Sequence, residues 1–287
     1  MSLTVRFWGV RGSVPAPGPR TAAVGGNTSC VEVRCGGETI ILDAGTGIRG
    51  LGERLLAGGR PVSASLLFSH VHWDHIQGFP FFPPLFRRDT ALVLHGRPDH
   101  GSLESALRQQ MTAPSFPVHL GAVPAALSFG EIEPGQPFEV GSALVRAARL
   151  NHPDGVLAYR IEVEGRAVVF ATDTEHHADG IDRDLVALAD GADLLIYDAQ
   201  YTPEEYAGVI GGPRSGWGHS TWVEGIRVAR AAGVGSLVLF HHDPSHDDGA
   251  VDAIERSARA MWPGTVAARE GLEIHLAGGS VMSGRAA

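Results

Sequence analysis

The segment 70–75, His-Val-His-Trp-Asp-His, constrains this chain more than any other stretch. It brings four metal-ligand side chains together within six residues, directly after the apolar run 65–68. In an extended or turning loop, residues two apart point to one side, so His70 and His72 can share one ion while Asp74 and His75 reach a second. Imidazole and carboxylate donors suit Zn²⁺, Mn²⁺ or Fe. The segment therefore predicts a metal site and not a solvated polar loop.

Further ligand-type residues follow apolar runs elsewhere in the chain, each as the first or second polar residue after the run. They are Asp43, His152, Asp173, Asp198 and His241. Open α/β folds gather their sites at strand ends on one edge of a sheet. Any one of these residues alone is better interpreted as a turn former. The repetition of the pattern predicts that they meet in one site.

Short apolar, β-branched runs predict strands, and longer amphipathic stretches predict helices. The expected strands lie near 3–9, 29–34, 38–42, 64–69, 91–95, 142–149, 157–163, 166–171, 193–197, 235–240 and 272–276. The expected helices lie near 48–57, 102–111, 181–189, 221–232 and 249–261, and the last but one has a capping-box start with Thr221 as N-cap and Glu224 at N3. This mixture is typical of an α/β sandwich with two packed sheets and outer helices. Because strands closely flank the Pro- and Gly-rich stretch 13–26, we interpret 1–287 as one domain.

Composition narrows the class of protein. The net charge of −9 and the lack of a basic run argue against a stable nucleic-acid partner. An anionic substrate remains compatible, because bound cations reverse the local field. No run of eighteen apolar residues and no signal-peptide pattern occur, so we expect a cytoplasmic protein without a membrane span. Cys30 and Cys35 lie five apart in one expected strand, hence on opposite faces, and are interpreted as two buried thiols.

Three groups of residues leave their roles open. The Phe- and Pro-rich stretch 78–86 fits a substrate-pocket wall, a dimer contact or core packing. The remaining histidines, interpreted as surface or packing residues, are His95, His100, His119, His176, His177, His246 and His275. His177 and His246 are the two best suited to support metal ligands. The arginines that could contact a phosphate, although solvated surface positions are the ordinary interpretation, are Arg11, Arg20, Arg87, Arg88 and Arg214.

Taken together, the motifs resemble those of the metallo-β-lactamase superfamily, in its branch of ribonuclease Z and related cyclic-nucleotide and phosphonate-pathway phosphodiesterases. The matching motifs are 25–29 (GGNTS), 42–47 (LDAGTG), 70–75 (HVHWDH), 151–153 (NHP), 172–174 (TDT), 197–199 (YDA), 218–221 (GHST) and 240–243 (FHHD). The 70–75 motif is typical of the superfamily, whereas Asp198 and the 219–221 element are typical of the phosphodiesterase branch. The resemblance covers nearly the whole chain and implies an αββα sandwich of two packed mixed sheets with outer helices.

The resemblance implies a dinuclear metal site, with Zn²⁺ as the first expectation and Mn²⁺ or Fe as alternatives. The implied ligands are His70, His72 and His152 for the first ion, Asp74, His75 and His241 for the second, and Asp173 for both. His242 is adjacent to His241, and we favour His241 because it comes first after its strand, as in ribonuclease Z. Asp43 resembles the family's carboxylate that holds the histidine loop without touching metal.

The resemblance also implies a mechanism. Two cations about 3.5–4 Å apart can share a water and lower its pKa, so that a metal-bridging hydroxide attacks phosphorus. Asp74 would orient that water as well as bind metal. The leaving alkoxide then needs a proton, for which His219 is the candidate donor, with Asp198 holding its other nitrogen and favouring the protonated ring. The expected catalytic residues are therefore Asp74, His219 and Asp198.

We expect a metal-dependent phosphodiesterase acting on a small phosphodiester such as a cyclic nucleotide. The chain is acidic and lacks the basic, Gly/Pro-rich arm with which long-form ribonuclease Z grips transfer RNA, so tRNA 3′-end processing is the alternative. A glyoxalase II-like thioester hydrolase would share the ligands, but a thiolate leaves unprotonated and gives His219 no task. A non-enzymatic metal-binding domain is disfavoured because all seven ligand positions are filled. A homodimer is a family-level expectation.

Overall fold

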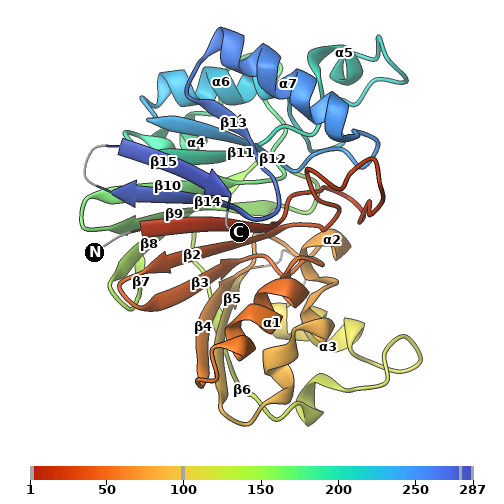
Figure 1. The fold of residues 1–287 in the computed structure, drawn as a ribbon, viewed down its shortest axis with the longest axis vertical. Coiled ribbons are helices and arrows are strands. Elements are labelled where there is room, and N and C mark those ends of the chain that lie inside the picture. Colours follow the sequence, from red (N-terminus) through yellow and green to blue (C-terminus); the bar gives the residue numbers. More distant parts are fainter. Residues whose placement is uncertain (1–2, 98–100, 278–279, 286–287) are drawn as a thin grey trace.

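The computed structural model describes residues 3–97, 101–277 and 280–285, and its strands form two sheets. The eight-stranded sheet has the order β15-β14-β1-β2-β3-β4-β5-β6, and the seven-stranded sheet the order β13-β12-β11-β10-β9-β8-β7. The two sheets stack face to face, with α6 and α7 outside one sheet and α1 and α3 outside the other (Figure 1). This αββα arrangement confirms the fold class expected from the sequence.

The eight-stranded sheet combines antiparallel and parallel pairs. Its strands are β1 (Leu3–Gly9), β2 (Cys30–Cys35), β3 (Glu38–Leu42), β4 (Val62–Leu67), β5 (Thr90–Gly96), β6 (Ala126–Glu131), β14 (Leu272–Ala277) and β15 (Ser280–Arg285). Strands β3 to β6 run parallel, while β1 pairs antiparallel with both β2 and β14. The parallel connections carry the helices α1 (Ile48–Ala57), α2 (Trp73–Ile76) and α3 (Leu103–Gln110), together with short 3₁₀ turns at Phe79–Phe81, Pro83–Phe86 and Leu120–Ala122.

The seven-stranded sheet brings its functional strand ends to one edge. Its strands are β7 (Phe138–Val140), β8 (Ala143–Leu150), β9 (Val156–Val163), β10 (Arg166–Ala171), β11 (Leu194–Asp198), β12 (Ser236–Phe240) and β13 (Thr265–Ala267). β10 to β13 run parallel, and β8 shares their direction because β9 is antiparallel to both β8 and β10. The connecting helices are α4 (Arg183–Ala189), α5 (Pro203–Tyr206), α6 (Trp222–Ala231) and α7 (Asp248–Met261). The carboxyl ends of β8, β10, β11 and β12 therefore share one edge.

Three apolar clusters hold these layers. The largest lies between the sheets and includes Phe7, Phe170 and Phe240, whereas the other two lie under the outer helices. Cys35 belongs to the cluster between the sheets and Cys30 to the cluster under α1. Both cysteines are free and buried, so the prediction of two thiols on opposite faces of one strand is confirmed.

Sequence patterns missed the weakest elements. β6 and β7 are half-exposed edge segments, β13 has three residues, and α5 has four, so none shows a full period of burial. The capping box predicted at Thr221 forms only in part: Thr221 Oγ1 accepts from Glu224 N at 3.4 Å, but the Glu224 carboxylate pairs with Arg227 at 2.9 Å. A reciprocal capping box starts α5 instead, between Thr202 and Glu205.

The side chains of the Phe- and Pro-rich stretch 78–86 lie in two environments, the core and the surface. Phe79, Phe82 and Leu85 are buried in the cluster under α1, which agrees with the core-packing interpretation. Phe81 is exposed and lines a hollow of about 640 Å³ together with Trp73 and Phe116. The stretch is thus part core and part surface.

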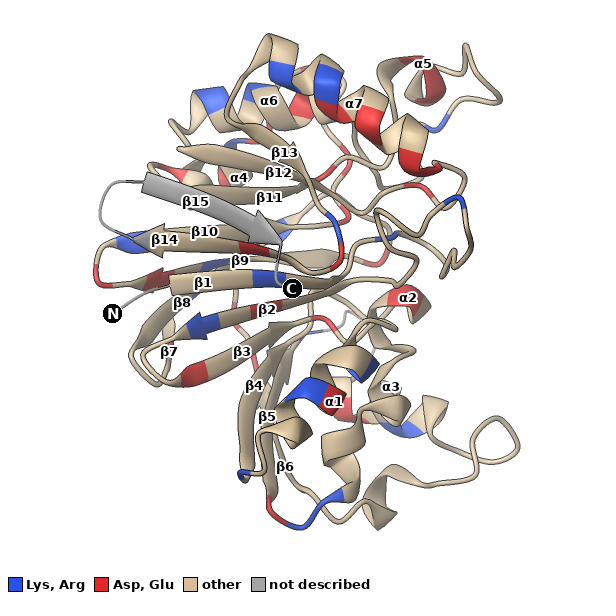
Figure 2. Ribbon diagram, in the orientation of Figure 1, with Lys and Arg blue, Asp and Glu red and all other residues tan. Residues whose placement is uncertain are grey.

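Charge on the outer surface is mixed in sign. Figure 2 shows acidic residues along the first part of α7 and basic residues toward its end, where Arg259 and Glu255 approach to 3.9 Å. Glu255 and Asp252 of the same helix also bind Arg269, at 2.6 and 2.7 Å. Within the described ranges, no helix is both long and apolar enough to span a membrane.

Candidate metal centre and active site

Ligand-type side chains from both sheets converge where the strand ends meet. Each of three groups has its ligand atoms within 4.8 Å of one another. The groups are His70, His72 and His152; Asp74, His75, Asp173 and His241; and Asp173, Asp198, His219 and His241. Every residue predicted as a ligand or catalytic group therefore lies in one continuous cluster, and Asp173 and His241 each belong to two of the groups.

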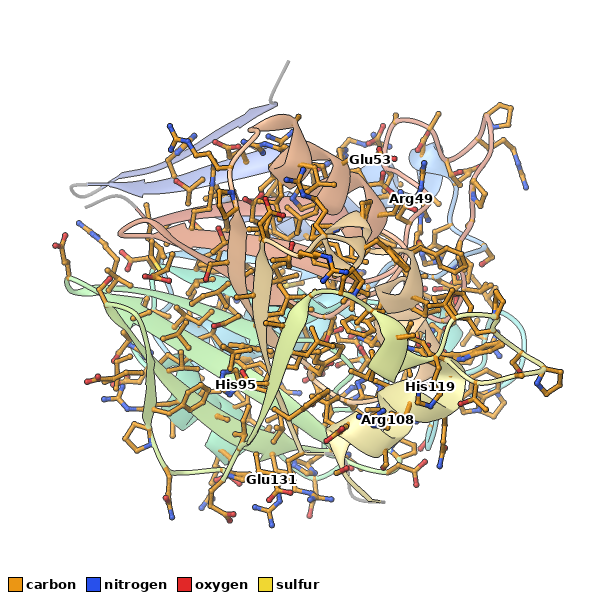
Figure 3. The ribbon with its side chains drawn as sticks, turned by 90° about the horizontal axis from the view of Figure 1, so that it is seen from below. Arg49, Glu53, His95, Arg108, His119 and Glu131 are labelled. Carbon is orange, nitrogen blue, oxygen red and sulfur yellow. The ribbon has the colours of Figure 1, made fainter. Side chains whose placement is uncertain are left out.

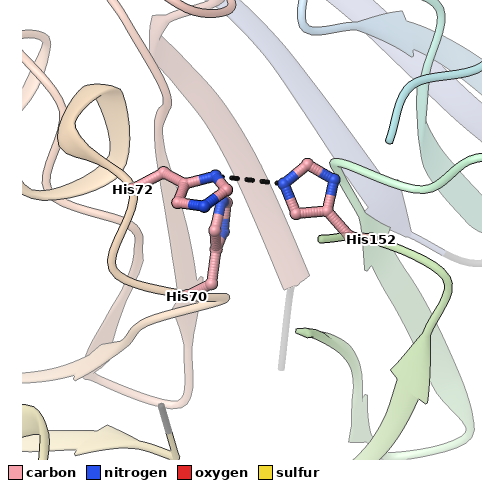
Figure 4. A group of neighbouring side chains, drawn as sticks. All are labelled: His70, His72 and His152. Atoms are coloured by element: carbon pink, nitrogen blue, oxygen red, sulfur yellow. Dashed lines mark hydrogen bonds between the residues drawn. The ribbon is translucent and has the colours of Figure 1, made fainter. Parts of the chain in front are cut away.

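The three-histidine group joins the 70–75 loop of one sheet to the loop after β8 of the other (Figure 4). His72 Nδ1 lies 3.1 Å from His152 Nε2, and the His70 ring centroid is 4.4 Å from that of His72 and 4.9 Å from that of His152. His70 Nε2 is buried and has no hydrogen-bond partner. A buried nitrogen lone pair left without a donor is costly in a polar core, so an electron-pair acceptor such as a cation suits this position.

The second group is tighter. His75 Nε2 lies 3.3 Å from His241 Nε2, and each of these nitrogens lies 3.2 Å from one oxygen of Asp74 and one of Asp173. Ligand atoms about 2.0–2.1 Å from a tetrahedral ion stand roughly 3.3 Å apart, so these spacings fit a small divalent cation. The other Asp173 oxygen lies 3.7 Å from His70 Nε2 and 3.9 Å from His152 Nε2. One carboxylate thus faces both groups.

Backbone geometry turns several of these residues toward the cluster. Asp43, Asp173 and His241 have φ values of 60°, 53° and 61°, in the left-handed region that non-glycine residues rarely adopt. Such a conformation costs on the order of 1–3 kcal/mol and occurs often at functional sites. Each follows a buried strand, so the left-handed residue ends the strand and aims its side chain across the sheet edge.

Hydrogen bonds on the far nitrogens fix how the imidazoles point. His75 Nδ1 lies 2.7 Å from Asp43 Oδ2, and Asp43 also accepts from the Ser69 backbone N–H and hydroxyl at 2.8 and 3.0 Å. His241 Nδ1 donates to Gln200 Oε1 at 2.9 Å. His152 Nδ1 donates to Gly218 O at 2.8 Å. With the outer nitrogen protonated, Nε2 of each ring presents its lone pair to the cluster.

His219 and Asp198 form a pair at the margin of the cluster. His219 Nδ1 lies 2.8 Å from Asp198 Oδ2, and its ring stacks on His241 with a centroid distance of 5.0 Å. Burial opposes charging of this imidazole, but the Asp198 carboxylate outweighs it and raises the pKa of His219 to about 9. Cations bound nearby would lower that pKa by repulsion. Asp198 is itself held by the backbone N–H groups of Gln200 and Thr174, at 3.0 and 3.3 Å.

In the second group, the close packing of carboxylates and imidazoles shifts the pKa values of Asp74 and His75. Burial alone would raise the pKa of the Asp74 carboxyl, but His75 and His241 outweigh it and hold that pKa well below the usual range. Burial would lower the pKa of His75, but Asp173, Asp74 and Asp43 raise it well above the ordinary value. Without metal, His75 therefore carries a proton that a cation must displace.

The choice between the adjacent histidines has a clear geometric outcome. His241 lies in the cluster, whereas His242 turns away and donates from Nε2 to Ala268 O at 3.0 Å. Burial lowers the pKa of His242 to about 3, so its ring is neutral. His177 and His246 have partners elsewhere, at 3.8 Å from Asp182 and 2.8 Å from Glu205, and neither is within the groups described.

Among the other histidines of described placement, His176 contacts Ser220 Oγ at 2.9 Å and His275 pairs with Glu273 at 3.1 Å, whereas His95 and His119 have packing and capping contacts. His95 stacks on Phe138 with a centroid distance of 5.3 Å, and His119 Nδ1 accepts from Gly121 N at 3.1 Å. Figure 3 shows His95 beside the strands and His119 near α3. His100 lies outside the described residues.

Sequence reasoning missed the residues that brace the site. Glu175 accepts hydrogen bonds from Gly216 N and Gly218 N at 2.7 and 2.8 Å, and so fixes the carbonyl that meets His152. Gln200 and Ser69 were also not singled out. Gln200 lies two residues after Asp198, and Glu175 two after Asp173, but that spacing alone carries no signal about side-chain contacts.

Comparison with known proteins agrees with this geometry. The family model described as a beta-lactamase superfamily domain matches residues 38–242. A ribonuclease Z of Gemmatimonas aurantiaca is 28% identical over 334 aligned positions, which cover 96% of this chain and 97% of that protein.

Solved structures share the fold. The metallo-β-lactamase fold protein YhfI of Bacillus subtilis matches with a TM-score of 0.71 and 21% identity, over 96% of this chain and 99% of that one. A diphosphatase of the PhnP family matches with a TM-score of 0.67 and 16% identity, over 96% of this chain and 98% of that one. At these identities the two structures speak for the αββα fold alone.

Proposed function

The chain belongs to the metallo-β-lactamase superfamily, and from that premise we propose that it is a phosphodiesterase acting on a small phosphodiester such as a cyclic nucleotide. The family and the His/Asp groups make it a metal-dependent hydrolase. The finer proposal names seven ligands. These are His70, His72 and His152 for one ion, Asp74, His75 and His241 for another, and Asp173 for both.

One observation carries the choice of a phosphodiester: the buried His219–Asp198 pair, 2.8 Å apart, at the margin of the ligand cluster. An alkoxide leaving group needs a proton as its bond to phosphorus breaks, whereas a thiolate does not. A carboxylate-paired imidazole beside the metals suits proton donation. This pair therefore supports phosphodiester cleavage over a thioester reaction.

The chain's own groups divide the work as follows. Asp74 receives a hydrogen bond from Ser13 N at 2.8 Å, so its carboxylate is fixed to orient a water molecule toward the substrate. His219 gives a proton to the leaving oxygen, and Asp198 stabilises its charged ring. Bound divalent ions would supply an activated water and would neutralise negative charge on the phosphate. Zn²⁺ is the first choice for the mixed imidazole and carboxylate set, with Mn²⁺ or Fe as alternatives.

Two observations support a small substrate. The net charge is −9, and proteins that follow a long nucleic-acid backbone neutralise many phosphates with basic side chains. The alignment with the Gemmatimonas ribonuclease Z runs over 334 positions, more than the 287 residues of this chain. That relative therefore contains segments without a counterpart here.

Because that relative is a ribonuclease Z, the second candidate function is that of an RNase Z-like endonuclease, which processes tRNA 3′ ends. A precursor tRNA incubated with the metal-loaded protein and analysed by electrophoresis separates the two. We expect no cleavage product at enzyme concentrations that hydrolyse a small phosphodiester. A single cut at the 3′ side of the tRNA body would replace our proposal with the second candidate.

The first experiment is hydrolysis of bis(p-nitrophenyl) phosphate by protein loaded with Zn²⁺ or Mn²⁺, beside a chelated control. We expect turnover that depends on metal and disappears with chelation. Elemental analysis of the same sample shows whether two ions are bound. Absence of turnover in protein that holds two ions would contradict the phosphodiesterase proposal and would favour a thioester substrate.

A further inference from the structure

We propose that Arg214 and Trp217 form a leaving-group subsite, which binds a second phosphate carried by the part of the substrate that departs. The inference rests on the proposed phosphodiesterase function and narrows its substrate class. The leaving part would be a nucleotide, as in a linear dinucleotide that carries a further terminal phosphate, and not an uncharged alcohol.

The two residues lie on the His219 side of the site. They belong to the loop between α5 and α6, which runs directly into His219. Arg214 Cζ lies 4.7 Å from the centroid of the Trp217 ring and 5.7 Å from that of Tyr201. The Tyr201 ring in turn meets the His219 ring, with a centroid distance of 6.0 Å. A single aromatic ring thus separates the guanidinium from the proposed proton donor.

The loop is held in this position by hydrogen bonds to Glu175 and to Tyr206. Glu175 accepts hydrogen bonds from Tyr206 Oη, Gly216 N and Gly218 N, at 2.7, 2.7 and 2.8 Å. The Arg214 backbone N–H donates to Tyr206 O at 3.1 Å. The Arg214 end of the turn is therefore bonded to Tyr206, and the Trp217 end is flanked by two N–H groups bonded to Glu175, which restrains the backbone that carries the two side chains.

The Arg214 guanidinium contacts the rings of Trp217 and Tyr201, and among the described residues no acidic side chain pairs with it. Its Nε is buried without a hydrogen-bond partner, so the Nη groups are the donors that a ligand would reach. Two other suggested arginines are less suited to a ligand: Arg11 is fully buried and donates to the backbone oxygens of Gly25 and His246, and Arg87 pairs with Asp89 at 2.6 Å. A guanidinium with unused donors beside an aromatic ring suits a phosphate oxygen.

Chemistry assigns this subsite to the leaving group. His219 delivers its proton to the departing oxygen, so groups next to His219 contact the part that carries that oxygen. Trp217 exposes 55% of its surface and offers a flat face to a base or sugar. A guanidinium stacked on that ring can then pair with a phosphate on the same nucleoside.

The test compares a substrate with two forms of it that each carry one further phosphate. Adenylyl-adenosine is hydrolysed beside its 5′- and 3′-phosphorylated forms, by the metal-loaded wild type and by Arg214→Gln. We expect the variant to raise KM about tenfold or more for the form whose leaving nucleoside carries the phosphate, because one charge-assisted contact is lost. KM for unphosphorylated adenylyl-adenosine should change less than about twofold, and kcat should hold for both.

Controls separate binding from folding. Arg256→Gln, on the exposed face of α7, should leave both substrates unaffected. Arg214→Lys keeps the charge but not the planar fork, so its effect should be intermediate. An equal loss on both substrates, or no loss on either, would overturn the subsite.

A binding measurement keeps the inference testable if wild-type protein cleaves no phosphodiester. Calorimetric titration of metal-free protein with adenosine 3′,5′-bisphosphate, beside adenosine, reports the subsite directly. Tighter binding of the bisphosphate by the wild type than by Arg214→Gln supports the subsite even where the proposed function fails. Equal affinity of the two proteins for the bisphosphate would refute it.

Discussion

The two sheets supply the site in different ways. The eight-stranded sheet provides His70, His72, Asp74 and His75 from one loop after β4, so four candidate ligands share a single stretch of backbone. The seven-stranded sheet provides its groups from separate strand ends. These are His152 after β8, Asp173 after β10, Asp198 at the end of β11, and His241 after β12, with His219 before α6.

The two sheets therefore position their ligand side chains by different means. In the first sheet, short-range geometry positions the ligands, and the Asp43 carboxylate ties the loop to β3 through His75 and Ser69. In the second, the register of four strands positions them, so each side chain depends on long-range packing. The neutral groups Gln200 and Gly218 then orient the rings of His241 and His152.

The largest expected effect comes from the residue that connects the two contributions. Asp173→Ala should abolish activity and lower the bound metal to below one ion per chain, because Asp173 oxygens face both ligand groups. Elemental analysis and phosphodiesterase assays measure both quantities. His177→Ala, a half-exposed histidine outside the groups, is the matched control and should retain both ions. Two ions retained by Asp173→Ala would refute its role for both metals.

The next effect concerns a residue contributed by the second sheet alone. His219→Ala should keep the metals but slow cleavage of an alkoxide-leaving substrate by about 10²–10⁴-fold, because the proton donor is lost. Cleavage of bis(p-nitrophenyl) phosphate should fall much less, since p-nitrophenolate leaves without a proton. Equal slowing of both substrates at saturating metal would assign His219 a different role.

A smaller effect on metal affinity is expected for the residues that hydrogen-bond the ligand histidines, Asp43 in the first sheet and Gln200 in the second. Asp43→Asn should weaken metal binding about 10–100-fold, because the amide cannot replace the charged partner of His75. Gln200→Leu should fall at the lower end of that range, since His241 loses a neutral acceptor only. Chelator competition measures both affinities. A larger loss of metal affinity in Gln200→Leu than in Asp43→Asn would contradict the expectation that the Asp43 contact matters more for metal binding.

The smallest effect tests the helix start behind His219. Thr221→Ala removes the side-chain acceptor of the Glu224 N–H and should lower the free energy of unfolding by about 1 kcal/mol. Metal content should not change, because none of the ligand groups contains Thr221. Chemical denaturation followed by circular dichroism measures the stability difference, and Ser102→Ala, which uncaps α3, is the comparison far from the site.

Local sequence determined much of the fold. Short apolar, β-branched runs predicted β1 and β3, and an amphipathic stretch predicted α1, with the bounds that the structure has. The half-buried β6 and the three-residue β7 and β13 carry too little pattern to be recognised. Their strand state depends on neighbours far away in the chain.

The sequence by itself determined the 70–75 ligand loop and the identity of the strand-end residues, because both depend on short-range order. Tertiary structure alone decided two things: that Glu175 fixes Gly218 against His152, and that Arg214 lies beside Tyr201, whose ring contacts His219. Each of these contacts depends on the strand register or on the course of a loop. Side chains distant in sequence meet only after the sheets have packed, so no local pattern encodes their contacts.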